Sequence, residues 1–496
     1  MLRNTVGMIV MAAMLASCGG SDSGGSTSSA TPTPPIAGPA PSPTPTPDTC
    51  SLRSRQDWVA EQLDEFYLFP DLLDLSVNPA DFSDVQSYIN AVVAPARAQN
   101  RDVGFTFITS IEEENAFFAS GTSAGFGIRL TLDGSGTRVF IIDAIEGAPG
   151  LNAGIDRGTE LLAIGTTTQN LRSVSDILAS EGGQGITNAL GPSTPGTSRV
   201  LRFVDTDGNE TTTTVTKTEF DTPPISPRFG VEIFDDGSRR IGYVNMRTFI
   251  GSSNDALRDA FAQFRTEGIT EVILDLRYNG GGLVSTAELF GDLLGANRFS
   301  SDIFSITAFR ESLSSNNTTR FFDPQPQSIA PIKIAVIATS ATASASELVT
   351  NSFLPYLGAD IALIGSNTSG KPVGQIAIDR EECDDRLRIV AFQTQNADGE
   401  GEYFNGLAGV MDRTCRATDD FLIPMGNANE TSIAQSLSFL RGENCTPIAG
   451  AAGFDGAANT ASDNATSIGF GGSLRGNQLL VPEVPTPAQR EVPGLF

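Results

Sequence analysis

The chain has 496 residues, five cysteines, no histidine and a formal net charge of −26 at pH 7. Its length allows about three ordinary domains. The excess of acidic residues argues against nucleic acid and anionic membrane surfaces as partners, because both require basic protein surfaces.

The first residues have the pattern of a targeting segment. Arg3 provides a short positive start, and the apolar run from Val6 to Leu15 is too short to span a bilayer as a mature helix. The run ends in Leu15-Ala16-Ser17-Cys18-Gly19, which resembles the cleavage box of bacterial lipoproteins. The resemblance implies a signal peptide over 1–18 and a lipid on Cys18 that anchors the protein in a membrane. We therefore expect an outer-membrane lipoprotein facing the periplasm of the cell envelope. Exposure at the cell surface and an ordinary secretory peptide are the alternatives.

The next segments change from linker to helix. Residues 19–49 are mostly Gly, Ser, Thr, Ala and Pro, which predicts a disordered tether. Residues 50–119 have apolar positions at helical spacing from Asp57 to Leu68 and again from Val85 to Ala94, which predicts a small helical N-terminal domain.

Residues 123–220 resemble a PDZ domain. The sequence Gly125-Phe126-Gly127-Ile128 resembles a carboxylate-binding loop, and Val139 to Ile142 forms a predicted strand. A second motif, from Gly147 to Gly158, resembles the small-residue helix and turn of such domains. Backbone N–H groups at a glycine-rich turn can bind a terminal carboxylate, and the bound peptide then adds to the sheet as a strand. The stretch after Leu178, with its glycines, predicts a long loop.

Residues 229–445 alternate between strand and helix patterns, which indicates a parallel-rich α/β core. Predicted strands span Arg240–Phe249, Glu271–Leu276, Ile332–Ile337 and Ile361–Ile364, and predicted helices span Asn254–Thr266 and Leu283–Leu294. A glycine-rich turn, Arg277 to Gly282, follows the second strand. A phosphate cradle is one interpretation of this turn, but the P-loop lysine is missing and the spacing is wrong for a dinucleotide site.

A run of small residues after the third predicted strand contains Ser344 and Ser346. A serine nucleophile needs a base, and histidine, the usual one, is absent. The chain has only three lysines, at positions 217, 333 and 371, so a serine–lysine pair is the economical hypothesis. Ser344 or Ser346 as a plain helix N-cap is the structural alternative.

The sequence ATASASE, followed by Gly370-Lys371 and by Gln375, resembles the C-terminal processing (tail-specific) peptidase family. The resemblance implies that Ser346 is the nucleophile, that Lys371 is the general base and that Gln375 helps to hold the lysine. It also implies that an amide of the glycine turn, Gly281 before Gly280 or Gly282, forms the oxyanion hole with the amide of Glu347. Burial between apolar strands would lower the pKa of Lys371 toward the working range.

The resemblance also implies a ClpP/crotonase-like α/β catalytic core with a preceding or inserted PDZ-like domain. The expected activity is that of an exported serine endopeptidase that cleaves proteins or peptides with unstructured C-termini. No cofactor and no metal are expected. A catalytically silent PDZ-containing binding or assembly protein on the same fold is the alternative, and a carboxylate-based glycan hydrolase is a weaker one.

Four cysteines remain after Cys18, and an even number in an exported chain suggests two disulfides. Three pairings are possible. We favour Cys383–Cys415, between two flanks of one segment, and Cys50–Cys445, between the ends of the folded region.

Residues 446–496 are predicted to form a low-complexity tail without its own core. The tail ends in apolar Pro493-Gly494-Leu495-Phe496. An apolar carboxyl terminus in a chain with a PDZ domain suggests capture or trimming of the chain's own end, and a frayed end is the alternative.

Overall fold

The structure, a computed structural model, describes residues 49–450 and 478–496. The expected signal peptide, Cys18 and nearly all of the tether lie outside these residues. The described residues form one compact unit. In the described part of the chain, no helix is long and apolar enough to cross a membrane.

The centre of the fold is a six-stranded sheet in the order β10-β11-β12-β15-β16-β19. Strands β11 to β19 pair in parallel, and β10 is antiparallel to β11. The parallel-rich α/β core predicted for this region is therefore present. The strands are β10 (Val231–Asp236), β11 (Arg239–Asn245), β12 (Glu271–Asp275), β15 (Lys333–Ala338), β16 (Ile361–Gly365) and β19 (Thr414–Arg416).

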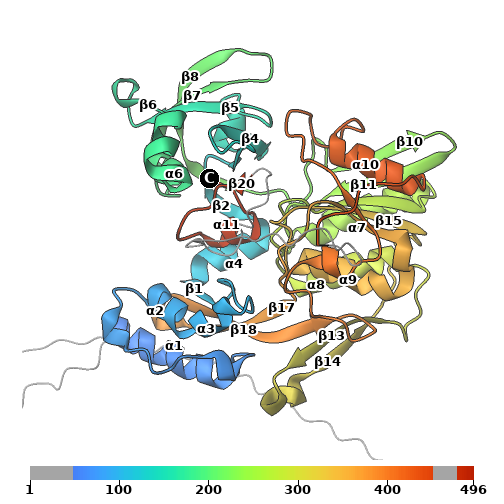
Figure 1. The fold of residues 1–496 in the computed structure, drawn as a ribbon, viewed down its shortest axis with the longest axis horizontal. Helices are drawn as coiled ribbons and strands as arrows, with labels where there is room; N and C mark the ends of the chain where they lie inside the picture. The colour runs from blue at the N-terminus through green and yellow to red at the C-terminus, as the bar shows by residue number, and fades with distance from the viewer. Residues whose placement is uncertain (1–48, 451–477) are drawn as a thin grey trace, which may run out of the picture. The chain divides into compact units, whose positions relative to one another are not determined.

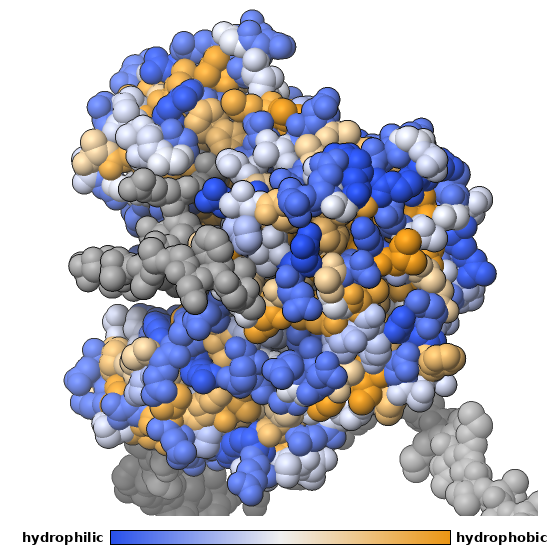
Figure 2. All heavy atoms as spheres, turned by 45° about the vertical axis from the view of Figure 1, so that its right-hand side comes forward, coloured by the Kyte–Doolittle hydropathy of each residue, from blue (hydrophilic) through white to orange (hydrophobic). Residues whose placement is uncertain are grey.

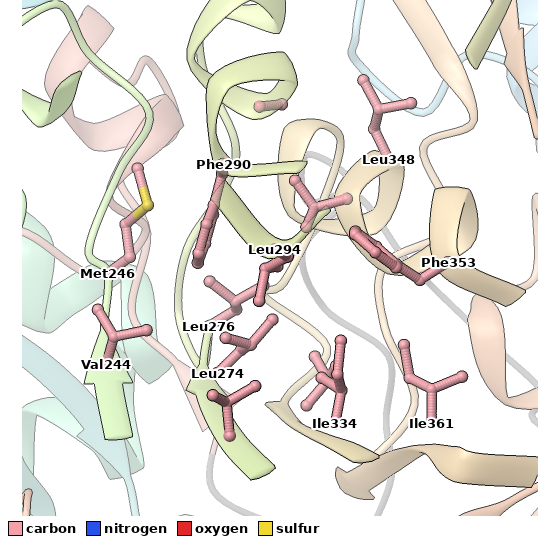
Figure 3. Packing of buried hydrophobic residues seen from close by; sticks show 14 of the residues in the cluster. Val244, Met246, Leu274, Leu276, Phe290, Leu294, Ile334, Leu348, Phe353 and Ile361 are labelled. Atoms are coloured by element: carbon pink, nitrogen blue, oxygen red, sulfur yellow. The ribbon is translucent and has the colours of Figure 1, made fainter. Parts of the chain in front are cut away.

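Helices cover both faces of this sheet, because its central strands are apolar on both sides. Helices α7 (Ser253–Thr266), α8 (Val284–Leu294) and α9 (Ala345–Leu357) pack on one face, and α10 (Thr431–Leu440) packs on the other. Figure 1 shows α10 on the opposite side of β15 from α8 and α9. Figure 3 shows Phe290 and Leu294 of α8 and Phe353 of α9 against strand residues such as Leu274 and Ile334. This core fixes the start of α9.

A seven-stranded antiparallel sheet lies earlier in the chain, in the order β20-β3-β4-β5-β7-β8, with β6 paired to β5. Its elements are β3 (Ile128–Leu132), β4 (Val139–Ala144), α5 (Pro149–Asn152), β5 (Glu160–Gly165), β6 (Arg172–Ser173), α6 (Val174–Leu190), β7 (Ser198–Val204), β8 (Glu210–Thr216) and β20 (Gln478–Leu479). The long loop predicted after Leu178 is wrong. The stretch is helical, and its helix is interrupted at Gly182, which has φ 65° and ψ −162°.

A five-stranded sheet carries the N-terminal helices. Strand β18 pairs with β1, β13 and β17, and β13 pairs with β14. The helices α1, α2 and α3 pack against it through Val59, Leu63 and Ile89, which meet Leu387 and Ile389 of β18. Its elements are α1 (Leu52–Phe66), α2 (Val85–Val92), α3 (Ala94–Ala98), β1 (Phe107–Ser110), β13 (Ile303–Phe309), β14 (Thr318–Phe321), β17 (Val373–Arg380) and β18 (Asp385–Gln395).

A short connection joins the five-stranded sheet to the seven-stranded antiparallel sheet. Helix α4 (Ile111–Ser120) follows β1, and a two-stranded sheet pairs β2 (Thr122–Gly125) with β9 (Thr218–Asp221). The segment from β2 to β9 therefore enters and leaves the antiparallel sheet at one place.

The expectation of two disulfides is met, but both expected pairings are wrong. The structure joins Cys50 to Cys383 and Cys415 to Cys445. Cys50 immediately precedes α1, which packs on the β17–β18 hairpin, and Cys383 lies at the turn of that hairpin. Cys415 lies in β19, and Cys445 follows the helix α10 that covers the same face. The layers that hold the cysteines decide the pairing, and sequence order does not show those layers.

The last residues of the chain are packed, and the frayed-end alternative is wrong. Strand β20 pairs with β3, and α11 (Pro487–Glu491) contacts α4. Figure 1 shows this segment in red beside α4. Residues 451–477 of the predicted tail lie outside the described residues.

The face of the molecule shown in Figure 2 is predominantly polar. On the face shown in Figure 2, hydrophilic residues prevail and hydrophobic ones form small groups among them. This agrees with the high net charge of the sequence.

Candidate active site

The expected nucleophile, Ser346, lies in the first turn of α9 and is fully buried. Ser344, the residue before this helix, adopts a positive φ of 54°. A non-glycine residue rarely takes this conformation, and such strain clusters at functional sites. Ser346 Oγ donates a hydrogen bond to the carbonyl of Asn279 at 3.2 Å. The serine therefore faces the glycine turn that follows β12.

The glycine turn is held rigidly beside α9. Asn279 donates through Nδ2 to the Met246 carbonyl at 2.8 Å, and its own carbonyl accepts the Ala343 N–H at 3.0 Å. Gly281 has φ 118°, and a Cβ there would lie 2.7 Å from Cβ of Ser344. Only glycine fits this close approach.

The turn presents a different amide from the one we expected. The Gly281 N–H donates to Oδ1 of Asn279 at 2.9 Å, so it already has a partner within the turn. The Gly280 N–H instead donates to the carbonyl of Glu491, in the chain's own tail, at 3.0 Å. A peptide carbonyl thus sits at the Gly280 amide, close to the serine. The Glu347 amide lies in the first helical turn, where N–H groups have no partner within the helix.

Lys371 lies in the loop between β16 and β17 and is 9% exposed. Its Nζ donates to Oε1 of Gln375 at 3.0 Å and lies 5.0 Å from the centre of the Phe105 ring. Gln375 in turn donates to the Phe105 carbonyl. Burial lowers the pKa of Lys371, while the carboxylates of Glu491 and Asp102 act in the opposite direction.

Glu347 has a role that the sequence did not reveal. Its fully buried carboxylate accepts the N–H of Gly370 at 2.7 Å, of Lys371 at 2.8 Å and of Ser344 at 3.0 Å. Burial raises the pKa of this carboxyl, and the N–H bonds oppose that rise. One side chain therefore ties the lysine loop to the start of the serine helix. The sequence signal for this role was an acidic residue directly after the candidate nucleophile.

The structure brings Ser346 and Lys371 onto neighbouring elements without joining their side chains. Among the described residues, no hydrogen bond links Ser346 Oγ to Lys371 Nζ, and each atom has another partner.

A network of buried charged residues holds the residues that begin the glycine turn. Arg277 bonds Asp275 at 2.8 Å, Glu430 at 2.8 Å and Asp419 at 3.0 Å. Asp275 and Arg277 are thus partners at the end of β12. Tyr278 adopts a φ of 63° and donates its hydroxyl to Asp419. The turn is anchored on both sides of the glycines.

The expected peptide-binding residues, Gly125 to Ile128, lead into the edge of β3. The N–H groups of Gly127 and Ile128 donate to the main-chain oxygen of Phe496 at 2.8 and 3.3 Å. Phe126 is fully buried under this loop. The loop thus binds the main chain of Phe496.

The sequence pattern of peptidase family S41 matches residues 240–407, which contain the glycine turn, Ser346 and Lys371. Residues 240–407 are therefore called the S41 segment below. The S41 segment includes most of the central sheet and all three helices on one of its faces.

Two curated relatives carry names of C-terminal processing enzymes. The chloroplastic C-terminal processing peptidase of Tetradesmus obliquus is 26% identical over 274 residues, covering 52% of this chain and 54% of that protein. The carboxyl-terminal-processing protease of Picosynechococcus is 25% identical over 253 residues, covering 51% of this chain and 55% of that protein. The matched part therefore spans about half the length of these relatives.

One solved structure resembles this fold over most of its length. It comes from Bacteroides fragilis and has been assigned to the S41 proteases. It is 23% identical, has a TM-score of 0.58 and covers 78% of this chain and 97% of that one. The likeness shows that the two share a mixed α/β fold.

Proposed function

We propose that the chain is a serine endopeptidase of the C-terminal processing type, with Ser346 as nucleophile and Lys371 as general base. The observation that carries the proposal is the buried carboxylate of Glu347, which binds the backbone of Lys371 and the start of the serine helix together. The S41 family match and the lowered pKa of Lys371 add support. A chain without histidine has few other bases to offer.

In the proposed reaction, neutral Lys371 leaves Gln375 and accepts the proton of Ser346 Oγ. The oxygen attacks the carbonyl carbon of the substrate, and the resulting ammonium then protonates the departing amine. This breaks the peptide bond and leaves an ester on Ser346. Lys371 next takes a proton from water, which attacks the ester and releases the new carboxyl terminus while the proton returns to Ser346.

The oxyanion would be bound by the amides of Glu347 and Gly280. Gly280 replaces Gly281 in this proposal, because its N–H already binds a peptide carbonyl while that of Gly281 is used by Asn279. Donors of this kind stabilise a charge that develops only in the transition state, and the loss of one typically costs about a hundredfold or more in rate.

Substrates would be proteins or peptides with unstructured carboxyl termini. We propose that residues 123–220 act as a PDZ-type module, because the Gly127 and Ile128 amides bind a chain terminus that also pairs with β3. The S41 segment would be its ClpP/crotonase-like catalytic core. We further propose export to the periplasm with a lipid on Cys18, which mass spectrometry of the mature N-terminus would test.

A catalytically silent peptide-binding protein is the second candidate. The observation that favours it is the separate bonding of the Ser346 and Lys371 side chains to Asn279 and Gln375. Such a protein would bind peptides at the same affinity with or without Ser346 and would never cleave them.

The test compares peptide cleavage by the wild type, Ser346→Ala and Lys371→Ala, each also made as a chain ending at Arg490. Ser352→Ala on the same helix and Lys333→Ala on β15 are the matched controls. We expect mass spectrometry to find products with the wild type and both controls, and none with the two active-site variants, whose unfolding temperatures should stay similar. Full activity in either active-site variant would refute the assignment.

A further inference from the structure

The groove that begins at Gly125 is occupied by the end of the same chain. Phe496 donates its N–H to the Ile128 carbonyl at 2.9 Å, and the Leu130 N–H donates to the Gly494 carbonyl at 3.0 Å. Leu495 forms an antiparallel bridge with Arg129. These bonds are those of a strand added to the edge of β3, which is how sheets bind extended peptides.

The terminal side chain is buried in the core of the antiparallel sheet. Phe496 is 2% exposed and belongs to the cluster that includes Ile128 of β3 and Ile177 of α6. The backbone at Gly125 lies so close that a Cβ there would be 2.7 Å from the carbonyl carbon of Phe496. The loop therefore fits a terminal main chain and an aromatic last side chain.

The middle of the segment is held as firmly as its end. Arg129, buried in β3, donates to the Pro493 carbonyl at 3.0 and 2.7 Å. Val492 and Leu495 pack with Phe117 of α4. The same Arg129 also donates to the Tyr278 carbonyl in the glycine turn, so the terminus and the turn share one cation.

Five residues before its end, the segment reaches the candidate catalytic centre. The Glu491 carbonyl accepts the Gly280 N–H at 3.0 Å. A Cβ on Gly280 would lie 2.6 Å from the Arg490 carbonyl and 3.2 Å from the carbonyl carbon of Glu491. The tail thus occupies the amide that we assign to the oxyanion and the groove that we assign to the substrate terminus.

We infer that residues 486–496 are an internal inhibitor, which occupies both the peptide groove and the candidate active site until it is displaced. The inference rests on the function proposed above. An external peptide must compete with a ligand that is part of the same molecule, and such linked ligands reach effective concentrations on the order of millimolar. For a groove with micromolar affinity, this lowers the apparent affinity for free peptides by about a hundredfold or more.

The tail brings charged groups of both signs close to Lys371. The Glu491 carboxylate acts to raise the pKa of Lys371, as Asp102 does, and this stabilises the ammonium form that cannot accept a proton. Arg388 and Arg490 act in the opposite direction. The tail therefore brings an acid to the base on which catalysis would depend.

The bound segment also defines the class of ligand that could displace it. Gly494 has φ 86°, and the two residues after it are apolar and buried. Competing ligands should have a free carboxylate, an aromatic last residue and a glycine at the third position from the end.

The binding experiment uses the Ser346→Ala background, so that it does not depend on catalysis. Fluorescence anisotropy would compare a labelled EVPGLF peptide on the full chain, on the chain ending at Arg490, on Phe496→Lys and on the control Val484→Ser, a residue that is 76% exposed and lies just before the segment. We expect the truncated chain and Phe496→Lys to bind at least about tenfold more tightly than the full chain and the control. An amidated peptide should bind more weakly than the free acid. Equal affinities for Phe496→Lys and the control would overturn the inference, even if the truncated chain fails to fold.

Activity and intact mass complete the test. With Ser346 present, the truncated chain should cleave peptides faster than the full chain by a similar factor, and the purified full chain should keep its last residues. Loss of residues 492–496 from the full chain but not from Ser346→Ala would overturn the inference, because the tail would then be a substrate. Tighter binding by the truncated chain without any cleavage would support the tail's role in the groove and refute the proposed peptidase function.

Discussion

The replacement Glu347→Gln tests whether one carboxylate positions the lysine. Oε1 of Glu347 accepts the Gly370 N–H, and Oε2 accepts the N–H groups of Lys371 and Ser344. An amide can present only one oxygen, so at least one of these buried N–H groups loses its partner in either orientation. A buried donor without a partner costs about 1–3 kcal/mol. Removal of the buried charge offsets part of this, and we expect a loss of about 1–2 kcal/mol in the free energy of unfolding.

The effect on rate should exceed the effect on stability. A displacement of about 1 Å in a catalytic group can cost about a hundredfold in rate. Urea unfolding at pH 8 would measure the change in stability. Peptide hydrolysis by the chain ending at Arg490 would measure the change in rate. Glu61→Gln, on the exposed side of α1, is the control and should change neither. Unchanged stability and rate in Glu347→Gln would refute the positioning argument, and a loss of stability alone would restrict Glu347 to a structural role.

Two further predictions concern charge. Lys371 must be neutral to act as a base and burial lowers its pKa, so activity should rise with pH and level off below the ordinary lysine value of 10.5. Because Glu491 acts to raise that pKa, Glu491→Gln should move the rising limb of the kcat/KM profile to lower pH. A rising limb at the same pH as in the control Glu483→Gln would contradict this. Arg277→Met should lower the free energy of unfolding by about 3–5 kcal/mol, because it leaves the buried carboxylates of Asp275 and Glu430 without their cation. Urea unfolding measures this loss. A loss no larger than that of the control Arg441→Met, at an exposed residue, would show that the network tolerates the change.

The elements of the central sheet could be predicted because their signals are local. Strand β12 and helix α7 follow from apolar runs and spacing that a short window contains, and their bounds agree with prediction to within a residue. The antiparallel sheet around β18 could not be predicted in this way. Its strand β1 pairs with a partner almost three hundred residues later in the sequence, and no local pattern records that pairing.

In the candidate site, too, some features could be predicted from the sequence and others could not. Ser346, Lys371 and Gln375 were predicted from the resemblance of one stretch to a peptidase family, and the structure places them on neighbouring elements. The clamp by Glu347 was missed, because its partners are backbone amides, which leave no trace in side-chain identity. The hydrogen-bond partners of the Gly280 and Gly281 amides could not be predicted, because they depend on where Asn279 directs its side-chain oxygen.

The bond between Cys50 and Cys383 has a consequence for how the protein is made. The two thiols are separated by 333 positions, so the earlier one is synthesised long before its partner exists. It must stay reduced, or exchange out of wrong pairs, while most of the polypeptide emerges. The disulfide that links the start of α1 to the β17–β18 hairpin therefore forms late in maturation. A shortage of oxidant or of disulfide exchange would leave this hairpin without its covalent link to α1.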